Sequence, residues 1–474
     1  MGDTDFFGRV GELESLQDAY DSAAAEMAII YGHRRIGKTV LIQKFCKGKP
    51  TFFYTAKAWK DPYQLDRFSQ AVGTFCGNPQ LRYLEWTSAL RALATQPSPV
   101  RKVIVIDEFQ YIAKERPSIL SELQVLWDEE LSQENILLVL CGSAVPLIAK
   151  EVLGEKNPLY GRARTIMKVR PLPFQTVSEF VPSYSADDVF RGYAVLGGIP
   201  YFWQGVNPQL SMTENLAANI LRSNGFLNDE AQSVLRQEFR DPATYNAILQ
   251  TIAFGSTSRN EIAQKSLVDT RTLSKYLSVL EDMDLVVKEL PVFAGSGELG
   301  NASRGRYRIV DPYVKFWFRF VANNPTLIMT RQEALSEWKA TVEPCFADFS
   351  AESFEQVCRQ YLTQLRFSGK LPFSGRLWGD GGETARRLIW LEPITKDGIV
   401  LWLNASIAIR KSGSKCCAPF RPNANNCRLR RMPYFTIGFF LAWDLTMCCL
   451  IWLHGILICI WSGGSVAGSK AVSR

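Results

Sequence analysis

The chain has 474 residues, which is enough for two to four domains with hydrophobic cores. It contains two histidines, His33 and His454, and this nearly excludes a histidine-based metal site or a Ser-His-Asp triad. Its net charge of +7 arises in residues 399–474, without which 45 basic and 46 acidic side chains remain, so the charge does not predict nucleic-acid binding by the whole protein. Residues 1–20 lack the apolar core of a signal peptide, so we expect a cytoplasmic protein.

A short apolar run at residues 27–31 ends in a glycine-containing loop that matches the P-loop pattern. Glycines let the backbone curl around phosphate, and the helix that follows points its positive end at the anion. Lys38 would neutralise the β- and γ-phosphates, and Thr39 would hold Mg²⁺. The pattern predicts that ATP binds to Gly32, His33, Arg34, Arg35, Ile36, Gly37, Lys38 and Thr39. The alternative is an ordinary strand-to-helix turn.

Apolar runs separated by helix-length segments predict a parallel sheet of the α/β class, with strands at 27–31, 51–55, 102–106 and 136–141. The third run is followed at once by Asp107 and Glu108, which is the Walker B pattern. Asp107 would belong to the Mg²⁺ shell, and Glu108 would orient and polarise the attacking water. An apolar strand that ends in acids is weak by itself, but its place after a P-loop makes it specific.

Two further side chains are candidates for the chemistry. Ser143 follows the fourth strand and would touch the γ-phosphate or its water, although it would also serve as a helix N-cap. Arg162 is the best candidate for the cation that stabilises the developing charge, from this subunit or from a neighbour in a homo-oligomer. The alternative for Arg162 is an ordinary surface charge.

Six short segments occur in a fixed order: Phe7-Gly8-Arg9, Tyr31–Thr39, Ile106–Gln110, Gly142-Ser143, Leu159–Arg162 and Leu196–Tyr201. In combination they resemble the archaeal-type P-loop ATPases, an AAA+/STAND-like family found in archaea and bacteria. The resemblance covers residues 5 to about 380. It implies that Gly8-Arg9 packs beside the adenine and that the Gly-Gly-Ile-Pro segment at 197–200 belongs to a helical lid. His33 departs from the family, which usually has arginine or another polar residue there.

The middle of the chain carries helical patterns at 243–253, 259–265 and 271–281, followed by strand-like runs at 284–292 and 307–310. Three helices and a β-hairpin predict a winged helix. The apolar run Phe316–Phe320 that follows is expected to be core rather than a ligand site.

The third of these helices is the candidate recognition helix. It opens with Asp269, Thr270, Arg271 and Thr272 and continues to Lys275, and these residue types bind duplex DNA through base edges and phosphates. The alternative is a module that couples the ATP state to a protein partner. Acidic residues at 281, 282 and 284 crowd the same element and weigh against DNA.

The C-terminal part resembles a PD-(D/E)xK nuclease domain at first, with a helix at 353–359 and a pre-strand segment at 375–379. The Asp strand and the Glu-x-Lys strand do not follow. Back-translation of Trp402–Ile409, read from the third base, gives Ala-Glu-Cys-Lys-Tyr-Arg-Asn, which supplies the missing Glu-x-Lys. In that frame, Arg386–Glu392 and Tyr434–Asp444 also encode amino-acid sequences that resemble those of the family. The hypothesis is a one-nucleotide frameshift between Trp378 and Ile389.

The rival interpretation takes the tail as written. Residues 435–461 are mostly apolar and long enough to span a bilayer, and arginines precede them. Asp444 near the middle would cost about 3 kcal/mol on insertion scales. Residues 399–474 are rich in Cys and Trp and contain one acidic residue, a composition typical of translation in a shifted frame. We therefore favour the frameshift and expect no functional contact between the tail and a membrane.

The sequence therefore predicts four parts: a P-loop NTPase domain with a helical lid (1–205), a winged-helix domain (206–325), a partial α/β nuclease-like domain (326–387) and an aberrant hydrophobic tail (388–474). The expected function is Mg²⁺-dependent ATP hydrolysis, with DNA binding as a further expectation. The alternatives are a nucleotide-gated protein-interaction switch without sustained turnover and an ATP-controlled nuclease that has lost its active site.

Overall fold

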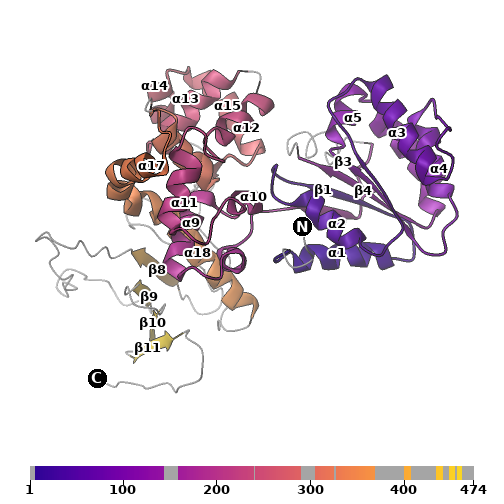
Figure 1. Cartoon of the computed structure of the whole chain (residues 1–474). Coiled ribbons are helices and arrows are strands. Elements are labelled where there is room, and N and C mark those ends of the chain that lie inside the picture. Colours follow the sequence, from indigo (N-terminus) through magenta and orange to yellow (C-terminus); the bar gives the residue numbers. More distant parts are fainter. Residues whose placement is uncertain are drawn as a thin grey trace, which may run out of the picture. The chain divides into compact units, whose positions relative to one another are not determined.

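A computed structural model describes residues 6–143, 158–239, 241–289, 305–324 and 327–368 and four later strands, and these residues form two compact units (Figure 1). The first unit comprises residues 1–183, 196–206 and 278–285. The second comprises residues 184–195, 207–277 and 286–474.

The first unit is built on a five-stranded parallel sheet of the order β2-β3-β4-β1-β5. The strands are β1 (Glu26–Tyr31), β2 (Thr51–Thr55), β3 (Lys102–Asp107), β4 (Ile136–Gly142) and β5 (Thr165–Lys168). Four strands were predicted from near-continuous apolar runs, which are typical of strands buried on both faces. The edge strand β5 was not predicted, because only one of its four residues, Met167, is buried and it carries no such run.

Helices cover both faces of this sheet (Figure 1). Along β1, Met27 and Ile29 join one core cluster, and Ala28 and Ile30 join the other, as the alternation of side chains along a strand requires. The first cluster packs against α3 (Asp61–Phe75), α4 (Trp86–Thr95), α5 (Gln110–Glu115) and α6 (Ile119–Glu129). The second packs against α1 (Val10–Asp21) and α2 (Lys38–Cys46).

The lid segment of the first unit includes α8 (Phe174–Val177), η3 (Ser178–Phe180) and α10 (Pro200–Trp203). Gly198 precedes α10 and accepts a hydrogen bond from the Leu172 amide at 2.7 Å. A Cβ at this glycine would lie 1.9 Å from the Leu172 carbonyl oxygen, so the approach of the two backbones admits no side chain. This contact fixes the start of α10.

The second unit is mostly helical. Its helices are α9 (Ala186–Leu196), α11 (Met212–Leu216), η4 (Ala217–Leu221), α12 (Glu230–Glu238), α13 (Pro242–Ala253), α14 (Arg259–Ser266), α15 (Thr270–Asp282), α16 (Pro312–Phe316), η6 (Trp317–Val321), α17 (Arg331–Glu337), η7 (Trp338–Val342), η8 (Glu343–Cys345) and α18 (Phe346–Phe367). The last residue of α9 and the last turn of α15 fall within the first unit.

The elements required by the winged-helix prediction occur in the expected order. After α13, α14 and α15 come two antiparallel strands, β6 (Val286–Glu289) and β7 (Arg306–Ile309). On α15, Leu273 and Leu277 are buried, as the helical periodicity predicts. The strand is shorter than the predicted 284–292, and residues 290–304 of the expected hairpin tip lie outside the described ranges. The winged-helix assignment stays a prediction.

The C-terminal helices of the second unit form an aromatic core. Phe316 is fully buried, with its ring 5.5 Å from the rings of both Trp338 and Phe349. This confirms that the apolar run at 316–320 is core. The helix expected at 353–359 lies inside α18, whereas residues 375–379 and the proposed frameshift interval lie outside the described residues.

Four strands are described in the tail: β8 (Val400–Ser406), β9 (Tyr434–Phe440), β10 (Cys448–Leu453) and β11 (Ile456–Trp461). They form a sheet of the order β11-β10-β9-β8, in which only the β8–β9 pair is parallel. In the part of the chain that the structure describes, no helix is long and apolar enough to cross a membrane.

Candidate nucleotide-binding site

The P-loop connects β1 to α2, and two glycines set its path. At Gly32 a Cβ would lie 2.5 Å from the carbonyl oxygen of Val169, the residue that follows β5 and whose amide donates to the Tyr31 carbonyl. Gly37 has a φ of 93°, a left-handed conformation that side chains disfavour, and it is the N-cap of α2. The helix therefore begins at Lys38, and its first N–H groups face the loop, as phosphate binding requires.

Lys38 is buried and holds the loop closed. Its ammonium donates to the carbonyl oxygens of Gly32 at 2.9 Å and His33 at 2.8 Å. Burial lowers the pKa of Lys38, and burial also lowers the pKa of His33. The ammonium is thus placed inside the loop, where a phosphate oxygen would compete with these carbonyls for it.

Thr39 and Asp107 meet at the carboxyl edge of the sheet. The Thr39 hydroxyl donates to Asp107 Oδ2 at 2.8 Å, although 68 residues separate them. The other carboxylate oxygen, Oδ1, accepts from the Glu108 amide at 2.9 Å. Asp107 is buried, so both oxygens are fixed by these contacts. The pairing joins the predicted Walker A and Walker B residues in one site.

Glu108 and Ser143 also lie together. The Ser143 hydroxyl donates to Glu108 Oε2 at 2.8 Å. Ser143 therefore contacts the predicted water-activating group from the end of β4, beyond any role as a helix cap. A third residue, Gln110, donates from Nε2 to the same Glu108 oxygen and to Ser143 Oγ. The sequence analysis assigned no role to Gln110. Its position two residues after Glu108 was the one feature of the sequence that could have indicated a role.

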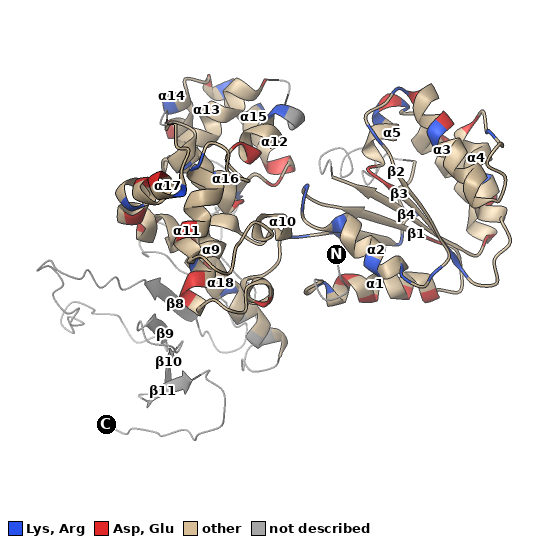
Figure 2. Ribbon diagram, viewed as in Figure 1, with Lys and Arg blue, Asp and Glu red and all other residues tan. Residues whose placement is uncertain are grey.

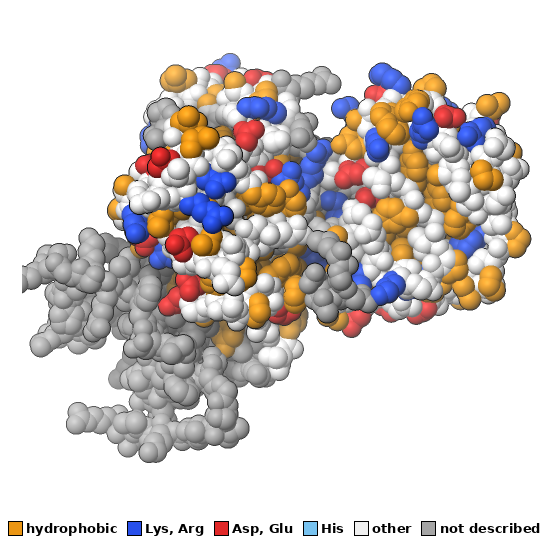
Figure 3. All heavy atoms as spheres, in the orientation of Figure 1, with side chains coloured by type: hydrophobic (Ala, Val, Ile, Leu, Met, Phe, Trp, Pro, Cys, Tyr) orange, Lys and Arg blue, Asp and Glu red, His pale blue; other side chains and the backbone are white. Residues whose placement is uncertain are grey.

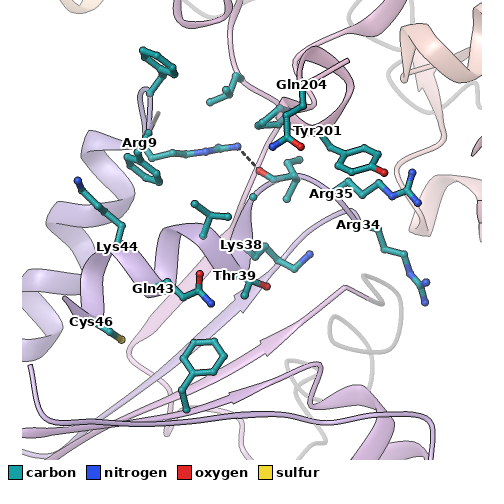
Figure 4. Close-up of a pocket in the computed structure, with 18 of the residues that line it drawn as sticks. Arg9, Arg34, Arg35, Lys38, Thr39, Gln43, Lys44, Cys46, Tyr201 and Gln204 are labelled. Atoms are coloured by element: carbon teal, nitrogen blue, oxygen red, sulfur yellow. Dashed lines mark hydrogen bonds between the residues drawn. The ribbon is translucent and has the colours of Figure 1, made fainter. Parts of the chain in front are cut away.

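A cavity of roughly 1060 Å³ opens beside these residues (Figure 4). Its charged lining is one-sided, with one acid, Glu108, among the described lining residues and six cations: Arg9, Arg34, Arg35, Lys38, Lys44 and Lys47. In Figure 2 basic residues are marked on the ribbon of α2, which begins at Lys38 and has Lys44 in its last turn. The cavity therefore suits a ligand with several negative charges.

Apolar and aromatic residues line another part of the same cavity: Phe6, Phe7, Leu172, Phe180, Pro200 and Tyr201. The rings of Phe7 and Phe180 are 4.6 Å apart. Arg9 donates to the Ile36 carbonyl at 3.1 Å and to Glu12 at 2.9 Å, and so ties the N-terminal segment to the P-loop. A flat apolar ring such as a nucleobase fits this chemistry.

Arg35 links the P-loop to the lid segment. Its guanidinium carbon lies 4.3 Å from the centre of the Tyr201 ring, which is a cation–π contact. Its backbone φ of 64° is left-handed. Figure 4 shows both side chains at the cavity. The contact gives the lid segment a direct connection to the phosphate-binding loop.

Arg162 is not among the residues that line this cavity. Its guanidinium makes two hydrogen bonds to Asp128, of 2.8 and 2.6 Å, and also donates to the Pro158 carbonyl. The hydrogen bond from Arg162 holds the pKa of Asp128 below its ordinary value. The structure thus brings together Lys38, Thr39, Asp107, Glu108 and Ser143, and engages Arg162 elsewhere.

Comparison with known proteins gives two family matches. Residues 6–203 match an ATPase domain found predominantly in Archaea. Residues 317–385 match archaeal and bacterial proteins of unknown function. Over 384 residues the chain is 31% identical to the uncharacterized protein MJECL04 of Methanocaldococcus jannaschii. The matched region covers 80% of this chain and 83% of the relative. Over 44 residues it is 46% identical to the uncharacterized ATP-binding protein MJ0423 of that organism, covering 9% of this chain and 75% of the relative.

Among solved structures, the Walker-type ATPase PABY2304 of Pyrococcus abyssi has a TM-score of 0.51 and 19% identity, covering 67% of this chain and 97% of that chain. This likeness shows the shared fold. The ATPase-domain match contains the P-loop and the two acids at the end of β3, Asp107 and Glu108. Together with the extended similarity to MJECL04, it shows that the chain belongs to the archaeal-type P-loop ATPases.

Proposed function

We propose that the first unit hydrolyses ATP in a Mg²⁺-dependent reaction. The observation that carries the proposal is the meeting of Lys38, the Thr39–Asp107 pair and the Glu108–Ser143 pair at one edge of the sheet. Lys38, Thr39 and Glu108 line the same cationic cavity. No single one of these contacts is specific, but a phosphate-binding lysine, a hydroxyl–carboxylate pair and a carboxylate facing a cavity are the parts that phosphoryl transfer needs.

The Thr39 hydroxyl and the Asp107 carboxylate would hold the metal. Both are hard oxygen donors, they already lie 2.8 Å apart, and Mg²⁺ prefers such ligands together with phosphate oxygens and water. Bound with the nucleotide, Mg²⁺ neutralises charge on the phosphate oxygens. Thr39 and Asp107 therefore fit the Mg²⁺ ion that the proposed function requires.

The protein residues divide the remaining work. Lys38 would leave the Gly32 and His33 carbonyls and donate to phosphate oxygens. The Glu108 carboxylate would accept a proton from the attacking water, since it lines the cavity and is held by Ser143. The aromatic lining that includes Phe7 would receive the base and exclude water around it.

Two variants test the proposal. We expect Lys38→Ala to abolish ATP binding, because the buried cation inside the loop is lost. We expect Glu108→Gln to bind ATP and to hydrolyse it at least about 100-fold more slowly, because the amide cannot accept the proton. ATP affinity and steady-state phosphate release measure the two effects. Equal turnover by Glu108→Gln and the wild type would remove Glu108 from the mechanism.

A second candidate function is a nucleotide-gated switch whose output is binding rather than work. The contact between Arg35 in the P-loop and Tyr201 in the lid segment favours it, because it ties the lid segment to the loop that would bind phosphate. Slow turnover with ATP-dependent binding of a protein partner would support the switch. Fast turnover that duplex DNA stimulates would support a motor instead.

DNA binding through the second unit is also proposed. On α15, Arg271, Thr272, Ser274 and Lys275 are all exposed. On the face that Figure 3 shows, charged side chains of both signs are interspersed with hydrophobic ones. We expect Arg271→Ala with Lys275→Ala to weaken duplex binding, measured by fluorescence anisotropy at several salt concentrations. Unchanged affinity and salt slope would exclude this helix.

Arg162 keeps its proposed role as a charge-stabilising cation only if it leaves Asp128 and reaches an ATP site, for example in a homo-oligomer. A mixing experiment tests this proposal: an Arg162→Ala protomer and a Glu108→Gln protomer should restore turnover together if the arginine acts between subunits. If the mixture is as inactive as its parts, Arg162 does not act in trans.

A frameshift near residue 380 is the proposed origin of the tail. The second family match ends at residue 385, inside the interval from 378 to 389 in which the shift was inferred. Sequencing the gene across this interval tests the proposal, and an unbroken frame that encodes the present residues would overturn it. A metal-dependent DNA cleavage assay on the full chain tests the alternative of an ATP-controlled nuclease.

A further inference from the structure

Gln110, the first residue of α5, occupies the space between Glu108 and Ser143. Its side chain is 4% exposed. Its Nε2 atom donates to Glu108 Oε2, and it lies 3.1 Å from Ser143 Oγ, which accepts a second hydrogen bond. The same Glu108 oxygen receives the Ser143 hydroxyl at 2.8 Å. Two donors therefore occupy one oxygen of this carboxylate and leave Oε1 as its open face.

The orientation of the Gln110 amide follows from its partner. An ionised carboxylate can only accept hydrogen bonds, so the NH₂ group must face Glu108 and the carbonyl oxygen must point away. Among the described residues, the buried Gln110 Oε1 has no hydrogen-bond partner. A buried acceptor without a donor is unfavourable, so a donor that arrives with the ligand would satisfy this oxygen.

The backbone brings these groups together at a conformational cost. Glu108 has a φ of 55°, a left-handed conformation that residues with a side chain seldom adopt because it is strained. The turn is fixed on both sides, because the Phe109 amide donates to the Cys141 carbonyl at 2.8 Å and the Tyr111 amide donates to the Glu108 carbonyl at 3.0 Å. The strained turn directs the side chains of Glu108 and Gln110 to the same place.

We propose that Gln110 is a positioning residue for the attacking water, an inference that rests on the proposed hydrolysis of ATP. Its Nε2 holds the Glu108 carboxylate in one orientation, and its Oε1, which has no donor among the described residues, would accept one O–H of the water while Glu108 accepts the other. The water oxygen forms a bond to the γ-phosphorus, and the bond from that phosphorus to the bridging oxygen breaks to release ADP. One water proton passes to Glu108. The other stays on the oxygen that enters phosphate, so Gln110 gains and loses nothing.

Substitution of Gln110 by methionine tests the proposal, because methionine has similar length and makes neither hydrogen bond. We expect kcat to fall about 10–100-fold while the affinity for a non-hydrolysable ATP analogue stays within twofold.

Gln64→Met is the matched control. Gln64 is another buried glutamine of the first unit, 1% exposed, and its amide contacts the backbone of Lys57 away from the cavity. We expect this variant to lower the melting temperature without moving kcat. An unchanged kcat in Gln110→Met would overturn the inference.

Equal kcat losses in Gln110→Met and Gln64→Met would also overturn the inference, because a purely structural role would then suffice. These results are distinct from failure of the proposed function. If the wild type binds ATP but does not hydrolyse it, hydrolysis itself is wrong and the role of Gln110 falls with it. If the wild type hydrolyses ATP and Gln110→Met matches it, the role of Gln110 alone is wrong.

Discussion

Two clusters of charged residues, one in each unit, differ in what surrounds them. In the first unit, Lys38 and Glu108 line the cavity beside the P-loop. In the second unit, Arg308 pairs with Glu289 at 2.7 Å and with Glu352 at 3.3 Å, and Lys315 pairs with the same Glu352. The second cluster joins β6, β7, α16 and α18, and its charges face one another.

The difference separates a binding site from a structural cluster. In the second unit, acidic partners from neighbouring elements neutralise the cations, so the cluster fastens the elements together. Around the cavity of the first unit, six cations accompany one acid among the described lining residues, and their positive field favours an anionic ligand. The presence of buried charge was not informative by itself; the imbalance of charge beside a cavity was.

The largest expected effect is on ATP turnover, which should depend on the acid beside the P-loop and not on the acid of the second cluster. Asp107→Asn removes a charge from the Thr39–Asp107 pair, so we expect ATP turnover with Mg²⁺ to fall at least about 100-fold. The same change of charge at Glu352, as Glu352→Gln, should leave turnover within twofold. Steady-state phosphate release measures both. Comparable losses in the two variants would mean that the second cluster also serves the reaction.

Stability should show the reverse order. Glu352→Ala leaves Arg308 and Lys315 without a shared acid and should lower the free energy of unfolding by about 1–3 kcal/mol, a value below that of a fully buried pair because the side chain is 27% exposed. Urea unfolding measures the change. Gln364→Ala, on the exposed face of the same helix, is the control. If it destabilises as much as Glu352→Ala, helix propensity rather than the ion cluster is responsible.

Acid should weaken the second cluster specifically. Burial alone would raise the pKa of Glu352, but Lys315 and Arg308 lower it below its ordinary value of 4.5. A lowered pKa in the folded state contributes stability that is present above pH 4.5 and is lost as the pH falls through the folded-state value. We expect unfolding free energies of the wild type and Glu352→Gln to converge below pH 4.5. Parallel profiles would contradict the assignment.

The smallest expected effect concerns the contact between Arg35 and Tyr201. Tyr201→Ala removes the ring, so we expect ATP affinity to fall about 2–30-fold, the equivalent of a 0.5–2 kcal/mol cation–π contact. Tyr201→Phe keeps an aromatic face and should stay near the wild-type affinity. Calorimetric titration measures both variants. Equal losses in the two would assign the effect to the tyrosine hydroxyl instead.

The sequence predicted four of the five strands of the first unit because parallel strands buried on both faces need apolar runs. The edge strand β5 escaped, since it is short and half exposed. Lys38 and Thr39 were predicted because a P-loop is a local pattern, and the structure brings both to the cavity. Gln110 was missed because its contact with Ser143 depends on the adjacent strands β3 and β4, which are distant in the sequence.

The sequence by itself determined that this chain binds a phosphate-rich nucleotide, because glycines, a lysine and a helix start act over eight consecutive residues. The tertiary structure alone decided which distant groups join them. Strand register places Asp107 against Thr39, and packing brings Phe7 to Phe180 and Arg162 to Asp128. Such contacts depend on how whole elements pack, because burial of apolar surface sets their positions and the polar side chains follow.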